Sequence, residues 1–469
     1  MGNTEQKQPD FDSFNTKMRR AGVREPTIRA FEYNYQHLAA GRTAFVPETS
    51  IEPVRDLPRF EDIAAGDTGD VSLLSKTVVL KLNGGLGTSM GLDRAKSLLP
   101  LRDGLTFLDF TVKQVQHLRA QYGVPPRFML MNSFTTSRDT LEFLKKYPEL
   151  GDPTSLELMQ SQVPKVDAAS LHPVEWPSNP GLEWCPPGHG DIYPSLLSSG
   201  WLERLLEEER QFLFVSNSDN LGASLDLGLL QHFAGSGLDF IMEVAERTAA
   251  DRKGGHLAMR DGRFMLRESA QCPENDMAAF QDIQRHRFFN TNNLWIRLDS
   301  LKTAVEANGG FIPLPLIQNS KTVDPRDKTS PRVIQLETAM GAAIELFPTA
   351  GAIVVPRTRF APVKTTSDLL ALRSDAYEVT NDWRIVLAAG PSGRPPAIDL
   401  DPDHYKLVDQ LDEKLREVPS LKGCTELVVK GPVLFNAKTV FKGKLDLANS
   451  HPEPRALPAG VYEDRSVEL

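Results

Sequence analysis

Short apolar runs alternate with helical patterns between residues 76 and 145. The runs TVVLKLN (77–83) and RFMLMN (127–132) are typical of short buried strands. Between them, LTFLDFTVKQVQHLRAQYG carries apolar residues at spacings of three and four, and Thr106 with Asp109 forms a capping box that marks a helix start. A second helix is expected to begin near TTSRDTLEFLKKY. This alternation of strand and helix predicts a parallel sheet with crossover helices.

Four further apolar runs extend this pattern toward the C-terminus. They are QFLFVSN (211–217), DFIMEVAE (239–246), FFNTNNLWIRL (288–298) and AIVVP (352–356). The stretch HLAMRDGRFMLRE is expected to form a hairpin, because Asp261-Gly262 suits a two-residue turn. Together the runs predict an α/β core whose sheet is mixed and mostly parallel.

The two ends of the chain have a different texture. Residues 1–75 are expected to be mostly helical, with proline- and aspartate-rich breaks and no strong strand signal. After residue 385 we expect a linker (PSGRPPAIDLDPDH), a bridging helix (DHYKLVDQLDEKLREV) and short glycine-punctuated strands. VKGPV and FKGKL lie about twelve residues apart, which suggests stacked β turns, with no further glycine-turned strand before the final EDRSVEL. The predicted domains are 1–75, 76–390 and 391–469.

Composition and charge exclude several classes of protein. The chain has 469 residues and a formal net charge of −9, which argues against nucleic acid or an anionic membrane as the main partner. The three cysteines are far apart and form no C-x-x-C pair, so neither a disulfide framework nor a zinc site is indicated. No apolar run has the length of a membrane span, and the polar N-terminus lacks the apolar core of a signal peptide. We therefore expect a cytoplasmic protein.

The segment KLNGGLGTSMGLDRAKS (81–97) is the first candidate for chemistry. It does not fit the P-loop pattern, and a G-x-G-x-x-G fingerprint fails because Met90 occupies the third glycine position. The glycines could simply permit a tight turn after the strand. Alternatively, their backbone N–H groups could cradle a phosphate with help from Lys96, at the end of a strand where open α/β sheets place ligands. The residues alone leave both interpretations open.

A series of longer motifs resembles a known family. KLNGGLGTSMG…AKS, LTFLDFTVKQ, MNSFTT, PPGHGDIY, VSNSDNLGA, KGGHL, FNTNNLW, VIQLETAMGAAI and RTRFAPVKTTSDLL occur in order between about residues 78 and 372. In this order they resemble the UTP–glucose-1-phosphate uridylyltransferases, also called UDP-glucose pyrophosphorylases. The resemblance implies a Rossmann-like nucleotidyltransferase core and a small C-terminal domain like a left-handed β-helix. It leaves open whether that domain assembles the chain into a homo-oligomer.

The resemblance also implies a reaction. The phosphate of glucose 1-phosphate would attack the α-phosphorus of UTP in line, in the presence of Mg²⁺, giving UDP-glucose and pyrophosphate. Because the nucleophile is already an ionised phosphate oxygen, such a site needs cations, backbone amides and metal-binding carboxylates rather than a catalytic triad.

The matched motifs imply roles for particular residues. Lys96 and Lys364 would be catalytic, and Asp219 would bind Mg²⁺. The nucleotide would be bound by Leu82, Asn83, Gly84, Gly85, Lys96, Gln160, Gly188, Asn217, Asp219 and Lys364. The sugar phosphate would be bound by His189, Gly255, Asn292, Asn293 and Glu337.

Alternatives remain for these residues and for the function. Asp219 could cap a helix or form an Asx turn, Lys364 could be a solvated lysine, and Asn290 to Asn293 could be turn formers. Arg94 and Ala95 depart from the family pattern just before Lys96, which affects the expected exit of the glycine loop. The rival functions are a pyrophosphorylase for galactose or N-acetylglucosamine 1-phosphate, and a catalytically silent nucleotide-sugar sensor.

Overall fold

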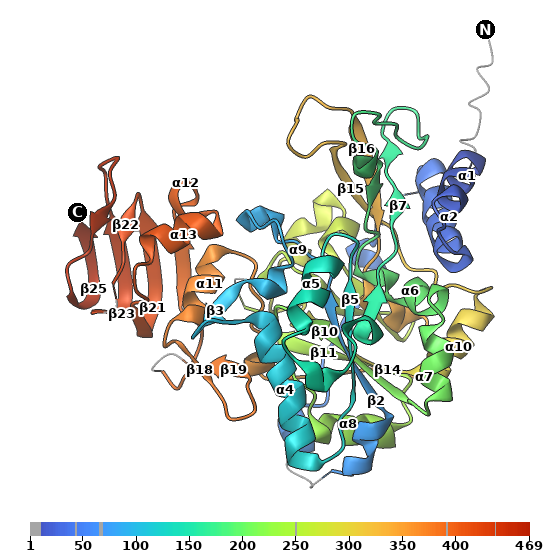
Figure 1. The fold of residues 1–469 in the computed structure, drawn as a ribbon, viewed down its shortest axis with the longest axis horizontal. Helices are drawn as coiled ribbons and strands as arrows, with labels where there is room; N and C mark the ends of the chain where they lie inside the picture. The colour runs from blue at the N-terminus through green and yellow to red at the C-terminus, as the bar shows by residue number, and fades with distance from the viewer. Residues whose placement is uncertain (1–10, 43–44, 65–68, 249–250, 391–392, 437) are drawn as a thin grey trace.

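The computed structural model describes residues 11–42, 45–64, 69–248, 251–390, 393–436 and 438–469. Its centre is a ten-stranded mixed sheet with the order β1-β12-β14-β10-β2-β5-β6, in which β11 and β13 add to β14 and β12, and β17 pairs with β11. Helices cover both faces, and the C-terminal strands form a separate sheet at one end of the molecule (Figure 1).

Six strands of the sheet are those that the apolar runs predicted. They are β2 (Thr77–Asn83), β5 (Arg127–Asn132), β10 (Phe212–Asn217), β11 (Phe240–Glu246), β14 (Phe288–Arg297) and β17 (Ala350–Val354). β10, β2, β5 and the short β6 (Glu157–Met159) run parallel, whereas β14 is antiparallel to both β10 and β11. The sheet is therefore mixed, but parallel pairing is less dominant than expected.

Alternate side chains of the central strands point to opposite faces, and both faces are buried. Val78 and Leu80 of β2 pack on one face in a cluster with α6 (Ile192–Ser198), α7 (Trp201–Glu207) and α10 (Leu298–Ala307). On the other face, Val79 packs with α4 (Phe107–Tyr122) and α8 (Leu227–Ser236). This burial explains the nearly continuous apolar character of these strands.

Local signals set the ends of several elements. The capping box of α4 is present, with the Asp109 amide donating to Thr106 Oγ1 and the Asp109 carboxylate accepting from the Thr106 amide. The hairpin of β12 (His256–Arg260) and β13 (Arg263–Arg267) turns at Asp261 and Gly262, which both have positive φ angles. The N-terminal part contains α1 (Asp12–Arg20), α2 (Glu25–Ala39) and α3 (Phe60–Ala64). It also contributes the short edge strand β1 (Glu52–Pro53), which the sequence did not predict.

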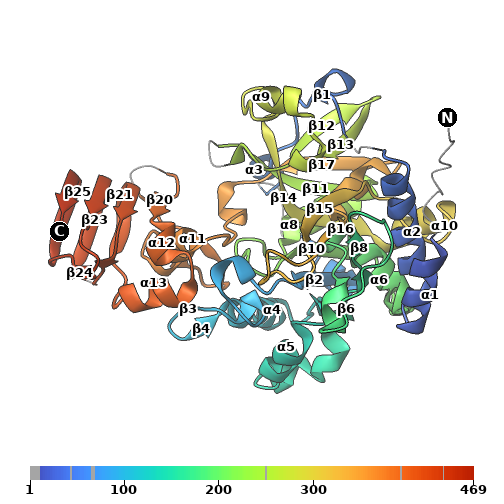
Figure 2. The same ribbon diagram turned by 90° about the horizontal axis from the view of Figure 1, so that it is seen from above.

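The C-terminal sheet is parallel throughout, with the order β20-β21-β23-β25. Its strands are β20 (Ala397–Leu400), β21 (Ser420–Lys430), β23 (Thr439–Ala448) and β25 (Gly460–Glu468), and β22 (Val433–Leu434) pairs in parallel with β24 (Arg455–Ala456). Figure 2 shows the four main strands stacked side by side beyond α12 (Pro402–Tyr405) and α13 (Val408–Lys414). Stacked parallel strands agree with the predicted β-helical character.

Four details of the C-terminal prediction were wrong. The interval of twelve residues is not the repeat, because Leu427 pairs with Leu445, which is 18 positions later (445 − 427), and Gly443 lies opposite Cys424. A further strand, β25, does follow. The expected single helix is two short helices, since Leu407 has an extended backbone between them, and the expected linker contains β20 and α12. The domain limits stay a prediction, and residues 391–392 at one of them lie outside the described residues.

Candidate active site

The glycine loop folds back on itself after β2. The Lys96 amide donates to the Gly85 carbonyl at 3.1 Å, which closes the loop. Gly87 and Gly91 have φ angles of 68° and 79°, in the left-handed region that favours glycine. A Cβ added to Gly85 would have no atom within 4 Å, so open space lies beside its backbone. A ligand can therefore approach the main chain closely at this point.

Asn83 joins the ends of three parallel strands beneath the loop. Its Nδ2 donates to Asn132 Oδ1 at 2.7 Å and to Thr140 Oγ1 at 3.0 Å. Its Oδ1 accepts from Ser218 Oγ at 3.2 Å. Since the side chain is buried and fully engaged, Asn83 holds the strand ends together and does not line the cleft.

Lys96 and Asp219 form an ion pair at the carboxyl ends of β2 and β10. Lys96 Nζ lies 2.7 Å from Asp219 Oδ2, and each side chain is 17% exposed. Lys96 Nζ also donates to the carbonyl of Val363. A partly exposed ammonium suits a phosphate, and a partly exposed carboxylate suits a hard cation. The pair can therefore exchange its internal contact for contacts with a charged ligand.

Gln160 lies between the glycine loop and the turn at residues 186–191. Its Nε2 donates to the Gly188 carbonyl at 2.8 Å. A Cβ added to Gly84 would lie 2.7 Å from Gln160 Oε1, so a side chain at position 84 would displace the carboxamide. The absence of a side chain at Gly84 thus makes room for Gln160.

His189 presents a neutral imidazole to the cleft. Its Nδ1 accepts a hydrogen bond from the Met340 amide at 3.1 Å, which places the proton on Nε2 in the neutral form. Burial lowers the pKa of His189 to about 4. Near neutral pH, Nε2 is therefore an uncharged donor.

The turn that carries His189 is paired with the end of β16 (Arg332–Glu337). The Gly190 amide donates to Thr338 O at 2.9 Å, and the Thr338 amide donates to Pro187 O at 3.0 Å. Gly188 has a φ angle of 79°, and a Cβ there would lie 2.6 Å from Thr338 O. This close pairing brings Glu337 beside the turn, although β16 belongs to a small sheet with β15 (Ile317–Thr322) and β8 (Val166–Asp167).

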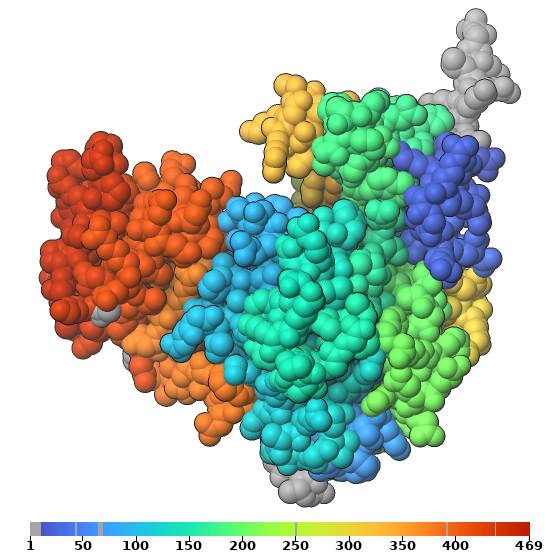
Figure 3. All heavy atoms as spheres, viewed as in Figure 1, coloured from blue at the N-terminus to red at the C-terminus, as the bar shows by residue number. Residues whose placement is uncertain are grey.

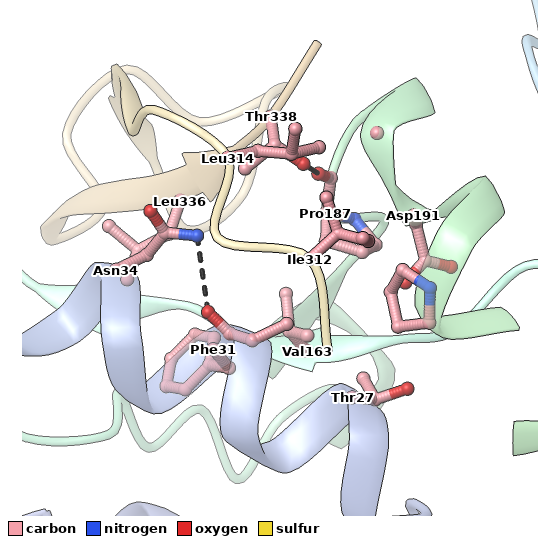
Figure 4. A pocket seen from close by; sticks show the side chains of 13 residues that line it. Thr27, Phe31, Asn34, Val163, Pro187, Asp191, Ile312, Leu314, Leu336 and Thr338 are labelled. Carbon is pink, nitrogen blue, oxygen red and sulfur yellow. Dashed lines mark hydrogen bonds between the residues drawn. The ribbon is translucent and has the colours of Figure 1, made fainter. Parts of the chain in front are cut away.

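Asp191 supports the same turn from behind. Its buried carboxylate accepts from the Ser161 amide at 2.6 Å and from Ser195 Oγ at 2.6 Å, and burial raises its pKa to about 7. A small cavity of about 30 Å³ lies next to it, and Phe31 and Asn34 of α2 line the same cavity (Figure 4). Helix α2 therefore packs behind the turn, and the hydrogen bond between Asp191 and Ser161 connects the turn to the segment that carries Gln160.

These parts surround one cleft of about 380 Å³, a size typical of small-molecule sites. Ten of the predicted residues line it, namely Leu82, Gly84, Gly85, Lys96, Gln160, Gly188, His189, Asn217, Asp219 and Glu337. The cleft is also lined by Gly87, Met131, Pro186 and Ser218, which the prediction did not include. The position of Met131 in the sequence could have indicated this role. Met131 is the second-last residue of its apolar run, as Leu82 is in its own run, and the two residues pair across neighbouring strands.

Lys364 and Gly255 lie outside this lining, in a second group of residues. Lys364 is exposed, with its Nζ 5.8 Å from the centre of the Phe289 ring, and follows Val363, which accepts from Lys96. A Cβ on Gly255 would lie 2.5 Å from Glu268 Oε2. Burial raises the pKa of the Glu268 carboxyl, which the charge of Lys364 opposes.

Asn292 and Asn293 also lie outside the lining, because β14 is irregular where they occur. The register with β11 shifts between Glu243 and Val244, and Asn292 has a φ angle of 59° with its Oδ1 accepting from Asn290. Asn293 is fully buried, and its Nδ2 donates to Glu243 Oε2 at 3.0 Å. Their predicted contacts with a sugar stay predictions.

Two features are absent from the residues that the structure describes. These residues contain no group of three or more His, Cys, Asp or Glu that could hold a metal ion. Nor do they include a helix with the length and apolar character needed to cross a bilayer.

Comparison with known proteins gives consistent results. A sequence profile described as UTP–glucose-1-phosphate uridylyltransferase matches residues 28–442. The protein of that name from Solanum tuberosum is 41% identical over 396 residues, covering 83% of this chain and 80% of the relative. The protein of that name from Saccharomyces cerevisiae is 40% identical over 407 residues, covering 87% of this chain and 80% of the relative.

Solved structures extend the likeness over nearly the whole chain. The crystal structure of UDP-glucose phosphorylase from Trypanosoma brucei has a TM-score of 0.91 and 48% identity, covering 97% of this chain and 99% of that one. A mutant of UDP-glucose pyrophosphorylase from Leishmania major, in complex with UDP-glucose, has a TM-score of 0.93 and 47% identity, covering 98% and 99%. The chain belongs to the UTP–glucose-1-phosphate uridylyltransferase family, whose members are also called UDP-glucose pyrophosphorylases.

Proposed function

We propose that this chain transfers a uridylyl group from UTP to glucose 1-phosphate, releasing pyrophosphate and forming UDP-glucose. The observation that carries the proposal is the convergence in one cleft of an open glycine backbone, the Lys96–Asp219 ion pair and the Gln160 carboxamide. Such a set suits a nucleoside triphosphate, because a carboxamide can hydrogen-bond to the edge of the base and the other groups can neutralise the phosphates.

The main obstacle to this reaction is repulsion between two anions. Two unit charges 4 Å apart repel by about 4 kcal/mol at an effective dielectric constant near 20, and several such pairs meet when both substrates bind. The nucleophile is an ionised phosphate oxygen, so the site needs to neutralise charge and align the reactants for in-line attack, without a general base.

The residues of the cleft divide this work in the proposed mechanism. Lys96 leaves Asp219 to bind the triphosphate, whose oxygens also meet amides of the glycine loop. Gln160 reads the uracil edge, and His189 donates from Nε2 to the phosphate of the sugar. Lys364 approaches from the adjacent segment and stabilises the charge that develops as pyrophosphate leaves.

Mg²⁺ is the proposed cofactor, and the donor chemistry fits it. Asp219 offers one carboxylate at the end of β10 beside Asn217, and Mg²⁺ is usually held by one or two carboxylates together with substrate phosphates and water. When bound, the ion would neutralise phosphate charge. The family match supports the same cofactor.

A direct assay tests the proposal. The purified protein is incubated with UTP, glucose 1-phosphate and Mg²⁺, and the release of pyrophosphate and formation of UDP-glucose are followed. We expect both products in equal amounts, and their formation should stop when EDTA removes the metal ion.

The same assay distinguishes the alternatives. Faster turnover with galactose 1-phosphate or N-acetylglucosamine 1-phosphate would show that the sugar is wrong. Binding of UTP or UDP-glucose without turnover of any sugar phosphate would indicate the nucleotide-sugar sensor.

The proposal also covers location and assembly. The three cysteines are free and buried, as is common in a reducing compartment such as the cytoplasm. A homo-oligomer would use the C-terminal sheet, whose last strand pairs on one side only within the described part of the chain.

A further inference from the structure

Two segments far apart in the sequence touch beside the cleft. One is the loop after β10 that carries Asp219, and the other is the stretch from Thr358 to Lys364. A Cβ added to Gly222 would lie 2.2 Å from Thr358 O and 3.0 Å from the carbonyl carbon of Arg359. The two backbones are therefore in direct contact, and only glycine permits it.

The side chain of Asn220 binds the second segment as a neighbouring strand would. Asn220 Oδ1 accepts from the Ala361 amide at 3.0 Å, and Asn220 Nδ2 donates to the Arg359 carbonyl at 3.1 Å. The side chain is 1% exposed. One carboxamide thus satisfies a donor and an acceptor of the same backbone, which fixes both the position and the direction of that segment.

The opposite side of the segment is fixed by a buried ion pair. The Arg359 guanidinium donates to the two carboxylate oxygens of Glu243 at 2.7 and 2.9 Å, and to Ser224 O at 3.1 Å. Because Arg359 is 2% exposed and Glu243 is fully buried, removal of either partner would leave an uncompensated buried charge. The backbone between Arg359 and Ala361 is therefore held from two directions.

The residues that follow reach the ion pair of Lys96 and Asp219. Val363 accepts a hydrogen bond from Lys96, the partner of Asp219, and Lys364 comes next. We propose that Asn220 is a positioning residue, which sets the distance between Lys364 and the carboxylate of its own neighbour, Asp219. This inference rests on the proposed function, since it assigns both groups to the same transition state.

The first experiment separates positioning from general stability. Asn220→Ala should lower kcat by about 10- to 100-fold, the effect expected of a misplacement near 1 Å, while UTP affinity changes by no more than about threefold. The control is Asn449→Ala, a buried asparagine of the C-terminal part whose Nδ2 also bonds two backbone carbonyls. This control should lower Tm without lowering kcat. A lower Tm with an unchanged kcat in Asn220→Ala would overturn the proposal.

A double-mutant cycle tests the route through Lys364. In a Lys364→Ala background, Asn220→Ala should cost less than about threefold in kcat, because the group that it positions is already missing. Equal losses in the two backgrounds would show that Asn220 does not act through Lys364. If Asn220→Ala fails to fold, Asn220→Asp serves instead, since it keeps the acceptor for Ala361 and loses the donor to Arg359.

A third measurement does not depend on activity. Hydrogen exchange of the Ala361 amide should be slow in the wild-type protein and much faster in Asn220→Ala, with little change in the strands of the central sheet. Unchanged exchange at Ala361 would overturn the inference even in an active enzyme. Absence of uridylyl transfer in the wild type would instead refute the proposed function, and the exchange data would still decide whether Asn220 holds this segment.

Discussion

The cleft and the C-terminal sheet are both built from parallel strands, but they are held together by different forces. Around the cleft, buried polar groups bind one another through several directed contacts, as Asn83 does with Asn132 and Arg359 with Glu243. In the C-terminal sheet, apolar residues such as Leu427 and Leu445 stack in register. Figure 3 shows the surface hollowed between this sheet and the part of the molecule that holds the cleft.

The difference predicts how each region responds to substitution. A buried hydrogen bond contributes only about 0.5–1.5 kcal/mol net to stability, but it fixes geometry. Apolar stacking contributes more to stability, and it specifies position less strictly. Substitutions near the cleft should therefore affect activity first, and substitutions in the C-terminal sheet should affect stability first.

The largest expected effect is on the stability of the C-terminal sheet. Phe441 is fully buried in β23, with its ring centre 6.0 Å from that of Tyr462. Phe441→Ala should lower the free energy of unfolding of this part by about 3–5 kcal/mol, because it leaves a cavity. Thermal unfolding measures the loss, and kcat of the protein that stays folded should match the wild type.

Phe441→Leu is the matched control and should retain most of the stability. A lower kcat in fully folded Phe441→Ala would contradict the difference between the two regions, because it would show that the C-terminal sheet sets the geometry of the cleft. Such coupling has a physical route, since Met90 of the glycine loop belongs to the same apolar cluster as Phe441.

The next largest effect is on catalysis. Lys364→Ala should lower kcat by about 10²- to 10³-fold, as for other groups that stabilise charge only in the transition state, while UTP affinity changes little. Steady-state kinetics and nucleotide binding measure the two quantities separately. Lys444→Ala, at an exposed lysine of the C-terminal sheet, is the control and should behave as the wild type.

Equal losses in UTP affinity and turnover would place Lys364 in ground-state binding. The exposed position of Lys364 makes this a real test, since its Nζ lies over Phe289 and outside the cleft lining.

A smaller effect concerns pH. The pKa of His189 in the folded chain is about 4, below the usual value of 6.5, so the unfolded chain binds more protons between these values. Stability is therefore full above pH 6.5 and falls as the pH drops toward 4, by about 2 kcal/mol between pH 7 and 5 for this group. His189→Asn retains an acceptor for the Met340 amide and should reduce this slope in urea unfolding.

An identical slope in the wild type and His189→Asn would show that His189 is protonated as easily in the folded chain as in the unfolded one.

The same contrast explains what the sequence could predict. β2, β5 and β10 are apolar runs that end in polar residues or glycine, so both the strands and most of the cleft residues at their ends could be found locally. The ion pair of Lys96 and Asp219 was not predicted, because Lys96 lies 13 positions after the end of β2 (96 − 83) and the fold of the glycine loop brings it back.

Long-range pairing limited the rest of the prediction. The sequence did not indicate the buried partners on other strands that bind the amides of Asn83 and Asn293, and the ligand contacts predicted for these two residues stay predictions. The glycines at 431 and 443 have similar neighbours in the sequence, which suggested an interval of twelve residues between stacked strands. The interval is set by the register between β21 and β23, and the sequence does not display that register. The structural role of Asp191 depends on Ser161 and Ser195, and its motif alone did not reveal these partners.

The smallest expected effect lies at the open edge of the C-terminal sheet. β25 is the last strand of that sheet, and Val461 on it is 56% exposed. An edge strand with an exposed apolar residue can pair with a second copy of the chain, and a lysine there opposes such pairing. Val461→Lys should change the free energy of unfolding by less than about 0.5 kcal/mol and leave kcat unchanged. If the wild type associates through this edge, sedimentation should show the variant shifted toward the monomer, whereas Val379→Lys, on β18 (Tyr377–Val379) outside that sheet, should not shift. An oligomer that survives Val461→Lys would place the interface elsewhere, and a wild type that stays monomeric at all concentrations would leave the sheet with a purely stabilising role.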